Sequence, residues 1–279
     1  MTLLVNVGCG AVAHASWSNF DVVPQLAHVQ ALDVRRGLPL GEGVAAAVYS
    51  SHVLEHLTES EARPFLAEMR RVLKPGGVIR LVVPDLEVIC RNYLHQLDGL
   101  STGAAMSSFA YQFTLLELFD QVVRDQSGGE LIAAYRGASG ADQAYVLARH
   151  GAEAAPYVGK PDAHSAPSAS TARPPPRTIS SIWARLRWQT LLACCRVVGG
   201  ESAVNKLRIG AFRQSGEVHR TMYDSYSLAA LLASHGFCDV RTLSAHESAI
   251  PGFAEYGLDV VAGSVRKPDS LFVEARKPK

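Results

Sequence analysis

Short apolar runs alternate with amphipathic stretches over the first 90 residues of the chain. Runs of this length without polar alternation are typical of strands that are covered on both faces. Four such runs occur, LLVNVG (3–8), VQALDV (29–34), VAAAVYSS (44–51) and VIRLVV (78–83). Their alternation with other elements predicts a parallel sheet with right-handed crossovers.

A helix is predicted between the third and fourth of these runs, from about Thr58 to Leu73. Thr58 and Ser60 are candidate N-caps, and the helix has acidic residues in its first turn and basic residues in its last. Pro75 cannot continue a helix, so we expect the helix to stop there and a strand to begin at about Val78.

The pattern changes to helical spacing from about residue 86 to 155 and returns to α/β character in the last 65 residues. We therefore expect 1–90 to be the first half of an α/β domain, 91–215 a helical insertion and 216–279 the rest of that domain. Residues 160–178 are rich in Pro, Ser and Ala, and their composition predicts a flexible linker. A further helix is predicted at 181–198.

Composition limits the class of protein. The chain has 279 residues, of which 48% are hydrophobic and 19% charged, as in a globular enzyme. A formal net charge of +1 does not favour nucleic acid as a partner. No signal peptide or membrane span is visible, and the five scattered cysteines do not form a zinc or disulfide pattern. A reducing cytoplasm is the simplest location.

Small and acidic residues follow the first three predicted strands. Gly8 and Gly10 form a glycine-rich turn after the first strand, where backbone N–H groups can face a ligand. Asp21 and Asp33 stand where the next two strands should end. Ligands bind at the carboxyl ends of strands in open α/β sheets. Two carboxylates there suit the ribose and adenine of a nucleoside.

Several motifs of the chain, taken together, resemble those of a known family. VNVGCG (5–10), the two aspartates, YSSHVLEHL (49–57) and EMRRVLKPGGVIRLVVPD (68–85) resemble the successive motifs of class I S-adenosylmethionine-dependent methyltransferases. The end of the chain, in HRTMYDSYSLAALLASHGF (219–237) and RKPDSLFVEARKP (266–278), resembles a bacterial subgroup associated with polysaccharide and cell-surface biosynthesis. This resemblance covers roughly residues 1–90 and 216–279. It implies a Rossmann-like, doubly wound and mostly parallel seven-stranded sheet with an antiparallel last strand, plus a helical insertion.

The resemblance also implies roles for residues. Asp21 would hold the ribose hydroxyls of S-adenosylmethionine and Asp33 would lie near its adenine. The methionine part would be bordered by Gly8, Cys9, Gly10, Ser51 and His52. The chain departs from the family pattern at two points. Asn6 stands in place of the usual acidic residue of the first strand. The connection from Gly10 to Asp21 is too short for a full helical crossover.

The sequence HVLEH (52–56) also matches the H-x-x-E-H signature of a class of zinc peptidases. Its place after a buried strand, without a further glutamate ligand downstream, favours the methyltransferase interpretation. His56 is then a packed or capping histidine, and Glu55 a partner for a nearby group. Some related methyltransferases hold a divalent ion through E-x-x-E-H at this position, where this chain begins with His52. We assign no metal ligands from the sequence, and this alternative stays open.

Three residues are candidates for catalysis. His52 would border the acceptor pocket, and Asp85 follows the fourth strand, where the alternative is an N-cap for the next helix. His219 precedes a predicted helix, and a histidine with a pKa near 6.5 suits a general base for a hydroxyl.

The sequence thus favours an enzyme that transfers a methyl group from S-adenosylmethionine to a sugar or glycan hydroxyl. The alternatives are a methyltransferase for a soluble small metabolite, a non-catalytic cofactor-binding partner protein and a nicotinamide-dependent oxidoreductase. The absence of the third glycine of the dinucleotide-binding motif argues against the oxidoreductase. Residues 173–213 hold eight Arg or Lys against one Glu, and two tryptophans lie in 181–198. We favour a buried insertion helix there; the alternative is peripheral contact with the anionic inner membrane.

Overall fold

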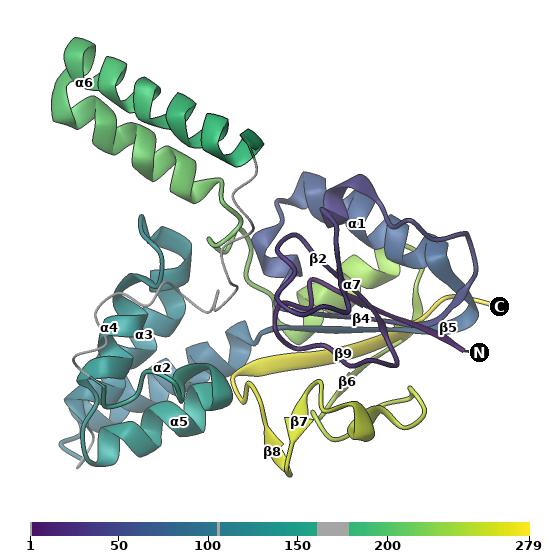
Figure 1. The fold of residues 1–279 in the computed structure, drawn as a ribbon. Helices are drawn as coiled ribbons and strands as arrows, with labels where there is room; N and C mark the ends of the chain where they lie inside the picture. Colours follow the sequence, from purple (N-terminus) through teal and green to yellow (C-terminus); the bar gives the residue numbers. More distant parts are fainter. Residues whose placement is uncertain (1, 105–106, 161–178) are drawn as a thin grey trace.

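The computed structural model describes residues 2–104, 107–160 and 179–279, and its centre is a seven-stranded sheet (Figure 1). The strand order is β3-β2-β1-β4-β5-β9-β6. The first five strands pair in parallel, and β9 is antiparallel to both of its neighbours. The predicted mostly parallel sheet with an antiparallel last strand is confirmed. Its strands are β1 (Leu3–Val7), β2 (Ser18–Asp21), β3 (Val29–Ala31), β4 (Ala45–Ser51), β5 (Leu73–Pro84), β6 (Cys238–Leu243) and β9 (Ser270–Arg276).

Parallel pairing brings the carboxyl ends of the first strands to one edge of the sheet. Val7 at the end of β1 lies beside Phe20 of β2 and Ser50 of β4. Asp21 at the end of β2 lies beside Ala31 of β3. The residues that follow these strands are therefore neighbours in space, although they are far apart in the sequence.

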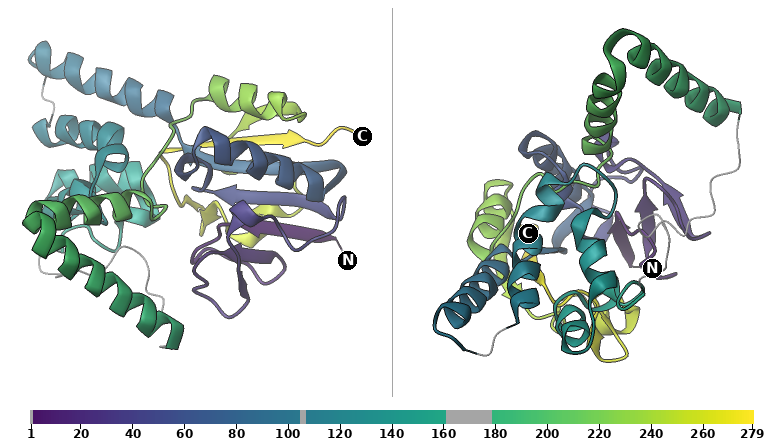
Figure 2. Two further views of the ribbon diagram at one scale, coloured as in Figure 1. Left: turned by 90° about the horizontal axis from the view of Figure 1, so that it is seen from above. Right: turned by 90° about the vertical axis from the view of Figure 1, so that its left-hand side faces the viewer.

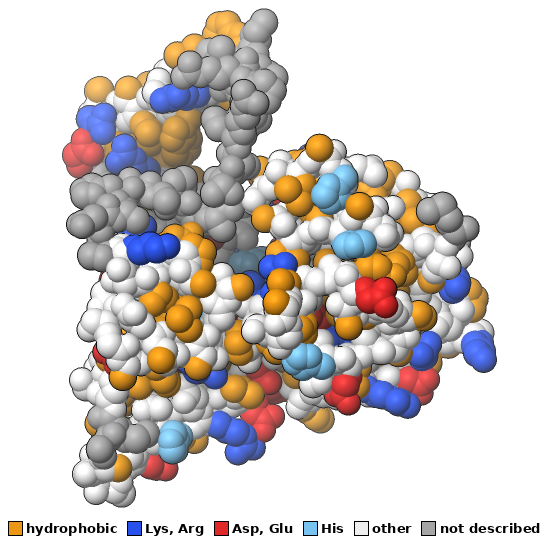
Figure 3. All heavy atoms as spheres, turned by 60° about the horizontal axis from the view of Figure 1, so that its bottom comes forward, with side chains coloured by type: hydrophobic (Ala, Val, Ile, Leu, Met, Phe, Trp, Pro, Cys, Tyr) orange, Lys and Arg blue, Asp and Glu red, His pale blue; other side chains and the backbone are white. Residues whose placement is uncertain are grey.

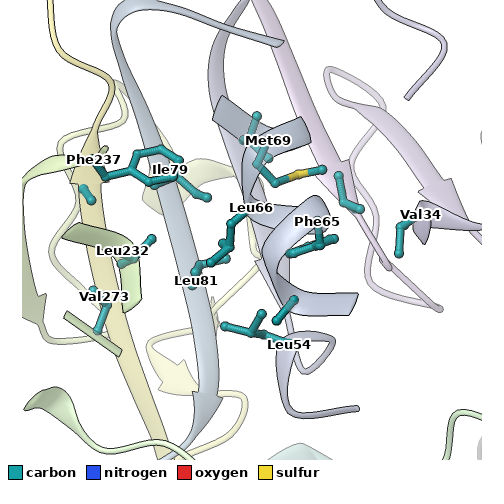
Figure 4. Packing of buried hydrophobic residues seen from close by; sticks show 14 of the residues in the cluster. Val34, Leu54, Phe65, Leu66, Met69, Ile79, Leu81, Leu232, Phe237 and Val273 are labelled. Carbon is teal, nitrogen blue, oxygen red and sulfur yellow. The ribbon is translucent and has the colours of Figure 1, made fainter. Parts of the chain in front are cut away.

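Two helices, α1 (Glu59–Val72) and α7 (Ser225–Ser234), cover one face of the sheet. The side chains of Leu66 and Met69 on α1 meet Ile79 and Leu81 of β5 (Figure 4). Leu232 of α7 packs beside them. This layer contains the larger hydrophobic core of the sheet.

The start of α1 is fixed by Thr58, as predicted. The carboxylate of Glu61 accepts hydrogen bonds from the Thr58 backbone N–H at 2.9 Å and from its hydroxyl at 2.8 Å. At the other end, β5 begins at Leu73, before the proline, rather than near Val78. The extra residues are tied to the end of the chain, because the Gly76 N–H donates to the Lys277 carbonyl at 2.9 Å.

The opposite face of the sheet is covered by the segment between β6 and β9. This segment contains a short 3-10 helix, η3 (Phe253–Tyr256), and a small hairpin of β7 (Val260–Val261) and β8 (Ser264–Val265). Its apolar residues pack on Trp17, Tyr49 and Phe272. Residues 8–17, between β1 and β2, contain no helix, which agrees with the short connection seen in the sequence.

A buried arginine joins this segment to the sheet. Arg80 on β5 is fully buried, and its Nε lies 2.7 Å from Asp259 Oδ2 while its Nη1 lies 2.9 Å from Glu274 Oε1. Its guanidinium also stacks over the Phe253 ring at 4.7 Å. The Tyr49 hydroxyl donates to the other oxygen of Asp259.

The chain between β5 and α7 forms a helical part beside the carboxyl edge of the sheet (Figure 2). It leaves and returns at neighbouring points, because the Leu86 N–H donates to the Tyr223 carbonyl at 2.9 Å and Asp85 forms a bridge with Tyr223. The boundaries at residues 90 and 215 stay a prediction. Its helices are α2 (Leu86–Ser101), α3 (Ser108–Val123), α4 (Gly129–Gly137), α5 (Ala141–Ala154) and α6 (Ile179–Arg213). Two 3-10 turns, η1 (Val34–Arg36) and η2 (Leu54–His56), lie elsewhere, at the sheet edge.

The helix α6 is broken at Gly200 into two antiparallel arms that project from the rest of the molecule (Figure 1). Large apolar side chains on it are exposed, with exposed fractions from 37% to 89% for Trp183, Leu186, Trp188, Leu191, Val197, Val198 and Ile209. Lys and Arg side chains lie among apolar ones on this hairpin, at the upper left of Figure 3. The expectation of a buried insertion helix is therefore wrong, because α6 projects away from the sheet and from α2–α5.

The predicted linker at 160–178 lies, except for Lys160, outside the described residues. In the part of the chain that the structure describes, no helix combines the length and apolar character needed to cross a bilayer.

Candidate functional site

Two cavities meet at the carboxyl edge of the sheet. The first has a volume of about 740 Å³ and is lined by residues at or just after the ends of β1 to β4, Asp21, Asp33 and His52 among them. The second, of about 590 Å³, lies between the glycine turn and the helical part. Gly8 and His52 line both cavities, so they stand at the junction.

The glycine turn after β1 depends on Gly8. Its φ is +69°, and a Cβ atom there would lie 2.2 Å from Cγ2 of Val53. Gly10 is also left-handed, with φ of +51°, but a Cβ there would meet nothing within 4 Å. The turn therefore passes close to the segment after β4, and only Gly8 requires the absence of a side chain for steric reasons.

Cys9 lies between these glycines and lines the second cavity. Burial and the nearby charge of Asp21 raise the pKa of its thiol to about 12. The thiol therefore stays protonated at neutral pH and is not a nucleophile. Its place suits packing against a ligand.

The two predicted aspartates lie in the first cavity. Asp21 ends β2, and its carboxylate accepts from the N–H groups of Gly10 at 2.7 Å and Val23 at 2.8 Å. Asp33 lies two residues after β3 as the N-cap of η1, rather than at the end of the strand as predicted. Its hydrogen bonds from Arg35 hold the pKa of its carboxyl below the ordinary value.

Ser51 and His52 end β4 at the junction. Ser51 lines the second cavity. His52 has a φ of +54°, which is a strained conformation for a residue with a side chain, and such strain concentrates at functional sites. Its Nε2 lies 2.9 Å from the Ser270 hydroxyl, and its Nδ1 lies 3.1 Å from Glu55. The ring is thus fixed between β9 and η2.

Glu55 is completely buried behind His52. Burial alone would raise the pKa of its carboxyl, but the charge of His52 lowers that pKa to about 2. Glu55 is therefore a buried carboxylate. The interpretation of Glu55 as a partner for a basic group agrees with this contact.

Two of the three predicted catalytic residues lie away from the cavities. His219 is 4% exposed, lines neither cavity and packs its ring against His56. Burial lowers the pKa of His219 to about 3, so the expected general base with a pKa near 6.5 is not realised. Asp85 lines neither cavity and caps α2, its carboxylate accepting from the Val88 N–H at 3.2 Å. Only His52 of the three reaches a cavity.

The structure also shows a series of hydrogen-bonded side chains beside the second cavity, which the sequence did not indicate. Tyr135, which lines this cavity, hydrogen bonds through its hydroxyl to Nδ1 of His150. Nε2 of His150 lies 3.0 Å from Glu117. Burial lowers the pKa of His150, but the charge of Asp269 and the contact with Glu117 outweigh it and raise that pKa. These residues come from α3, α4 and α5, so no short motif could reveal them.

A further pair faces the same cavity. Lys267 Nζ lies 2.9 Å from Glu153 Oε2, and both residues line the cavity wall. The charge of Lys267 is the main cause that lowers the pKa of Glu153. The second cavity therefore carries a pair of opposite charges in its wall, one from α5 and one from the segment before β9.

Part of the chain is similar in sequence to known methyltransferases. Residues 5–81 match the family model described as a methyltransferase domain. A stretch of 60 residues is 40% identical to an uncharacterized methyltransferase of Synechocystis sp.. That match covers 22% of this chain and 27% of the relative, so the chain spans about a quarter of the curated relative that it matches.

Two solved structures are similar over nearly the whole chain. One comes from the complex of the Trm112 methyltransferase activator with a methyltransferase of Haloferax volcanii, at 10% identity and a TM-score of 0.38, covering 100% of this chain and 83% of that one. The other is a SAM-dependent methyltransferase of Thermotoga maritima, at 11% identity and a TM-score of 0.37, covering 99% and 83%.

Proposed function

We propose that this chain is an S-adenosylmethionine-dependent methyltransferase that methylates a hydroxyl group of a sugar or glycan. The observation that carries the proposal is the first cavity. Gly8, Asp21, Asp33 and His52 line it together at the carboxyl edge of a sheet whose first strands match a methyltransferase domain. This is the edge where open α/β sheets bind their ligands.

The residues of the first cavity fit the cofactor. A Cβ at Gly8 would collide with Val53, so the turn keeps a close approach open for a ligand. Asp21 is the residue to hold the ribose hydroxyls, and Asp33 the residue to lie near the adenine. Gly8, Cys9, Gly10, Ser51 and His52 would border the methionine part. When bound, S-adenosylmethionine supplies an activated methyl group on a sulfonium, so the protein needs mainly to align the acceptor and exclude water.

The second cavity is the proposed acceptor site. It adjoins the first at Gly8 and His52, and the helical part closes it from the other side. Tyr135, Glu153 and Lys267 give it hydrogen-bonding groups for an acceptor that carries hydroxyls. A soluble small metabolite with such groups is the alternative acceptor.

Tyr135 is the proposed proton acceptor for the reacting hydroxyl. The step needs neutral His150: as Tyr135 takes the proton of the acceptor, its own proton passes to Nδ1 of His150, and Glu117 stabilises the imidazolium. Because the pKa of His150 is raised, this neutral form increases as the pH rises through that pKa. His52 stays at the junction, where its fixed ring shapes the passage between the cavities. In this proposal His219 and Asp85 do not touch the reacting groups.

Calorimetry tests the cofactor. We expect S-adenosylhomocysteine and S-adenosylmethionine to bind, and NAD not to bind. Asp33→Ala should weaken S-adenosylhomocysteine binding by about 1.5–3 kcal/mol, because it removes a hydrogen bond to a charged group. Asp125→Ala, an exposed aspartate that lines neither cavity, is the matched control and should leave the affinity unchanged. Unaltered affinity in a folded Asp33→Ala variant would reject this role.

Methyl transfer from labelled S-adenosylmethionine to a set of sugars, glycan intermediates and soluble metabolites then separates the remaining functions. Transfer to a sugar or glycan supports the proposal. Transfer to a soluble metabolite alone would show that the enzyme is a methyltransferase with that metabolite, and not a glycan, as its acceptor. Cofactor binding without transfer to any of them favours the non-catalytic partner protein.

We also propose that the α6 hairpin rests on the anionic inner face of a membrane and brings the enzyme to a lipid-linked acceptor. Its exposed tryptophans and leucines lie among basic residues, and Glu201 is its only acidic residue from 183 to 213. Apolar side chains at the headgroup level and basic residues near anionic lipid favour such contact.

Co-sedimentation with vesicles tests the hairpin. The wild-type protein should bind vesicles with anionic lipid at low salt and be released by added salt. Arg185→Glu with Arg187→Glu should lower binding about thirtyfold or more, at about 1 kcal/mol for each basic residue. Arg63→Glu with Arg91→Glu changes the charge equally on exposed residues away from α6 and should lower binding far less. A wild-type protein that stays in the supernatant would contradict the proposal.

A further inference from the structure

Three side chains with metal-binding atoms converge behind the first cavity. Glu55 and His56 belong to η2, and His219 comes from the segment that follows α6. One ligand atom from each lies within 4.8 Å of the other two. The rings of His56 and His219 meet edge to face, with centroids 4.8 Å apart.

Glu55 lacks the hydrogen bonds that a buried carboxylate needs. Its side chain is completely buried, and neither of its oxygens accepts a hydrogen bond. His52 lies 3.1 Å away, but this contact has the geometry of an ion pair rather than of a hydrogen bond. Burial of a charge without such bonds is costly, and coordination of a cation is one of the ways in which proteins offset that cost.

The hydrogen bond of the His56 ring suits a metal ligand. Nδ1 of His56 lies 3.3 Å from the Val218 carbonyl, which only accepts, so Nδ1 carries the proton and Nε2 keeps its lone pair. A backbone carbonyl on the far nitrogen is a common feature of metal-binding histidines.

Backbone hydrogen bonds hold the two contributing segments together. The N–H groups of Arg220 and Thr221 both donate to the Glu55 carbonyl, at 2.7 and 3.2 Å, and the His219 N–H donates to the Gln121 carbonyl at 2.9 Å. His219 thus faces η2 because the chain on either side of it is fixed. Backbone hydrogen bonds therefore hold the three side chains close together.

We propose that Glu55, His56 and His219 bind one divalent transition-metal ion of the Zn²⁺, Co²⁺ or Mn²⁺ kind. Two nitrogens and one carboxylate suit these ions better than Mg²⁺ or Ca²⁺, which prefer oxygen ligands alone. Two atoms bound at about 2.1 Å to the same ion are at most about 4.2 Å apart, so the cluster has to close by only roughly half an ångström. His56 lines the first cavity, which gives the ion access from that side.

Metal titration of the full-length protein, made without a histidine tag and dialysed against a chelator, tests the site. We expect one Zn²⁺ or Co²⁺ per chain, with visible absorption bands for Co²⁺, and no comparable binding of Mg²⁺. Loss of a partner that only orients a ligand costs 10–100-fold in metal affinity, so Glu55→Gln and His219→Asn should each cost at least about tenfold. His246→Ala, an exposed histidine outside the cluster, should bind like the wild-type protein.

Thermal unfolding distinguishes a ligand from a structural residue. Zn²⁺ should raise the unfolding temperature of the wild-type protein and of His246→Ala, but not that of Glu55→Gln. If the variants do not fold, the same Zn²⁺ and Co²⁺ measurements on the wild-type protein alone decide the matter. No binding by the wild-type protein, or binding that Glu55→Gln and His219→Asn leave unchanged, would overturn the inference. The site does not depend on cofactor binding, so it stands or falls separately from the proposed function.

Discussion

Arg80→Leu is expected to lower the free energy of unfolding by about 3–5 kcal/mol, because it removes one partner of a buried ionic cluster. Asp259 and Glu274 would each keep a buried carboxylate without its main cation. The variant also loses the contact that ties the segment with η3 to β5. Urea unfolding, followed by tryptophan fluorescence, measures the change.

Two further variants separate charge from packing. Arg63→Leu breaks the exposed ion pair with Glu59 on α1 and should change stability little. Adding Asp259→Asn to Arg80→Leu removes one of the unpaired charges, and it should recover part of the lost stability. If Arg80→Leu cost no more than the surface variant, the buried cluster would contribute nothing to the fold.

Gly8→Ala should abolish S-adenosylhomocysteine binding and destabilise the protein by more than about 1–2 kcal/mol, the cost of a left-handed conformation for a residue with a Cβ. The new Cβ would also stand 2.2 Å from Cγ2 of Val53. Val53 is β-branched and its side chain is stiff, so it cannot easily move away. Calorimetry with S-adenosylhomocysteine and urea unfolding report the two effects.

Gly10→Ala is the matched control for Gly8→Ala. It has the same conformational cost but no collision, so it should be the milder of the two variants. Removing the opposing side chain, in Gly8→Ala with Val53→Ala, should restore part of the binding. Equal losses in Gly8→Ala and Gly10→Ala would show that the contact with Val53 does not matter.

The local patterns of the sequence predicted most of the sheet. Apolar runs found β1 and β4, and the cap at Thr58 found the start of α1, because these features depend on neighbouring residues. The pattern failed for α6, where apolar residues predicted burial although the hairpin projects from the molecule. Periodicity tells which side of a helix is apolar and not whether anything covers that side.

The site was predictable where it follows strand ends. Gly8, Asp21 and His52 lie together because parallel strands bring their carboxyl ends to one edge. Tyr135 and His150 could not be found in this way, since their contact depends on how α4 and α5 pack. The environment of His219 was also hidden, because burial is the main cause of its lowered pKa, and its ring packs against His56, which is far away in the sequence.

Asp85 and Tyr223, where the chain leaves the sheet and returns to it, lie side by side. Because the chain leaves the sheet and rejoins it side by side, the sheet places no demand on the length of what lies between. Closing a longer excursion costs only about 0.6 kcal/mol for each doubling of its length. Evolution could therefore exchange or enlarge everything between these two residues, and with it the helical wall of the second cavity, while the strands that carry Gly8, Asp21 and Asp33 stay as they are.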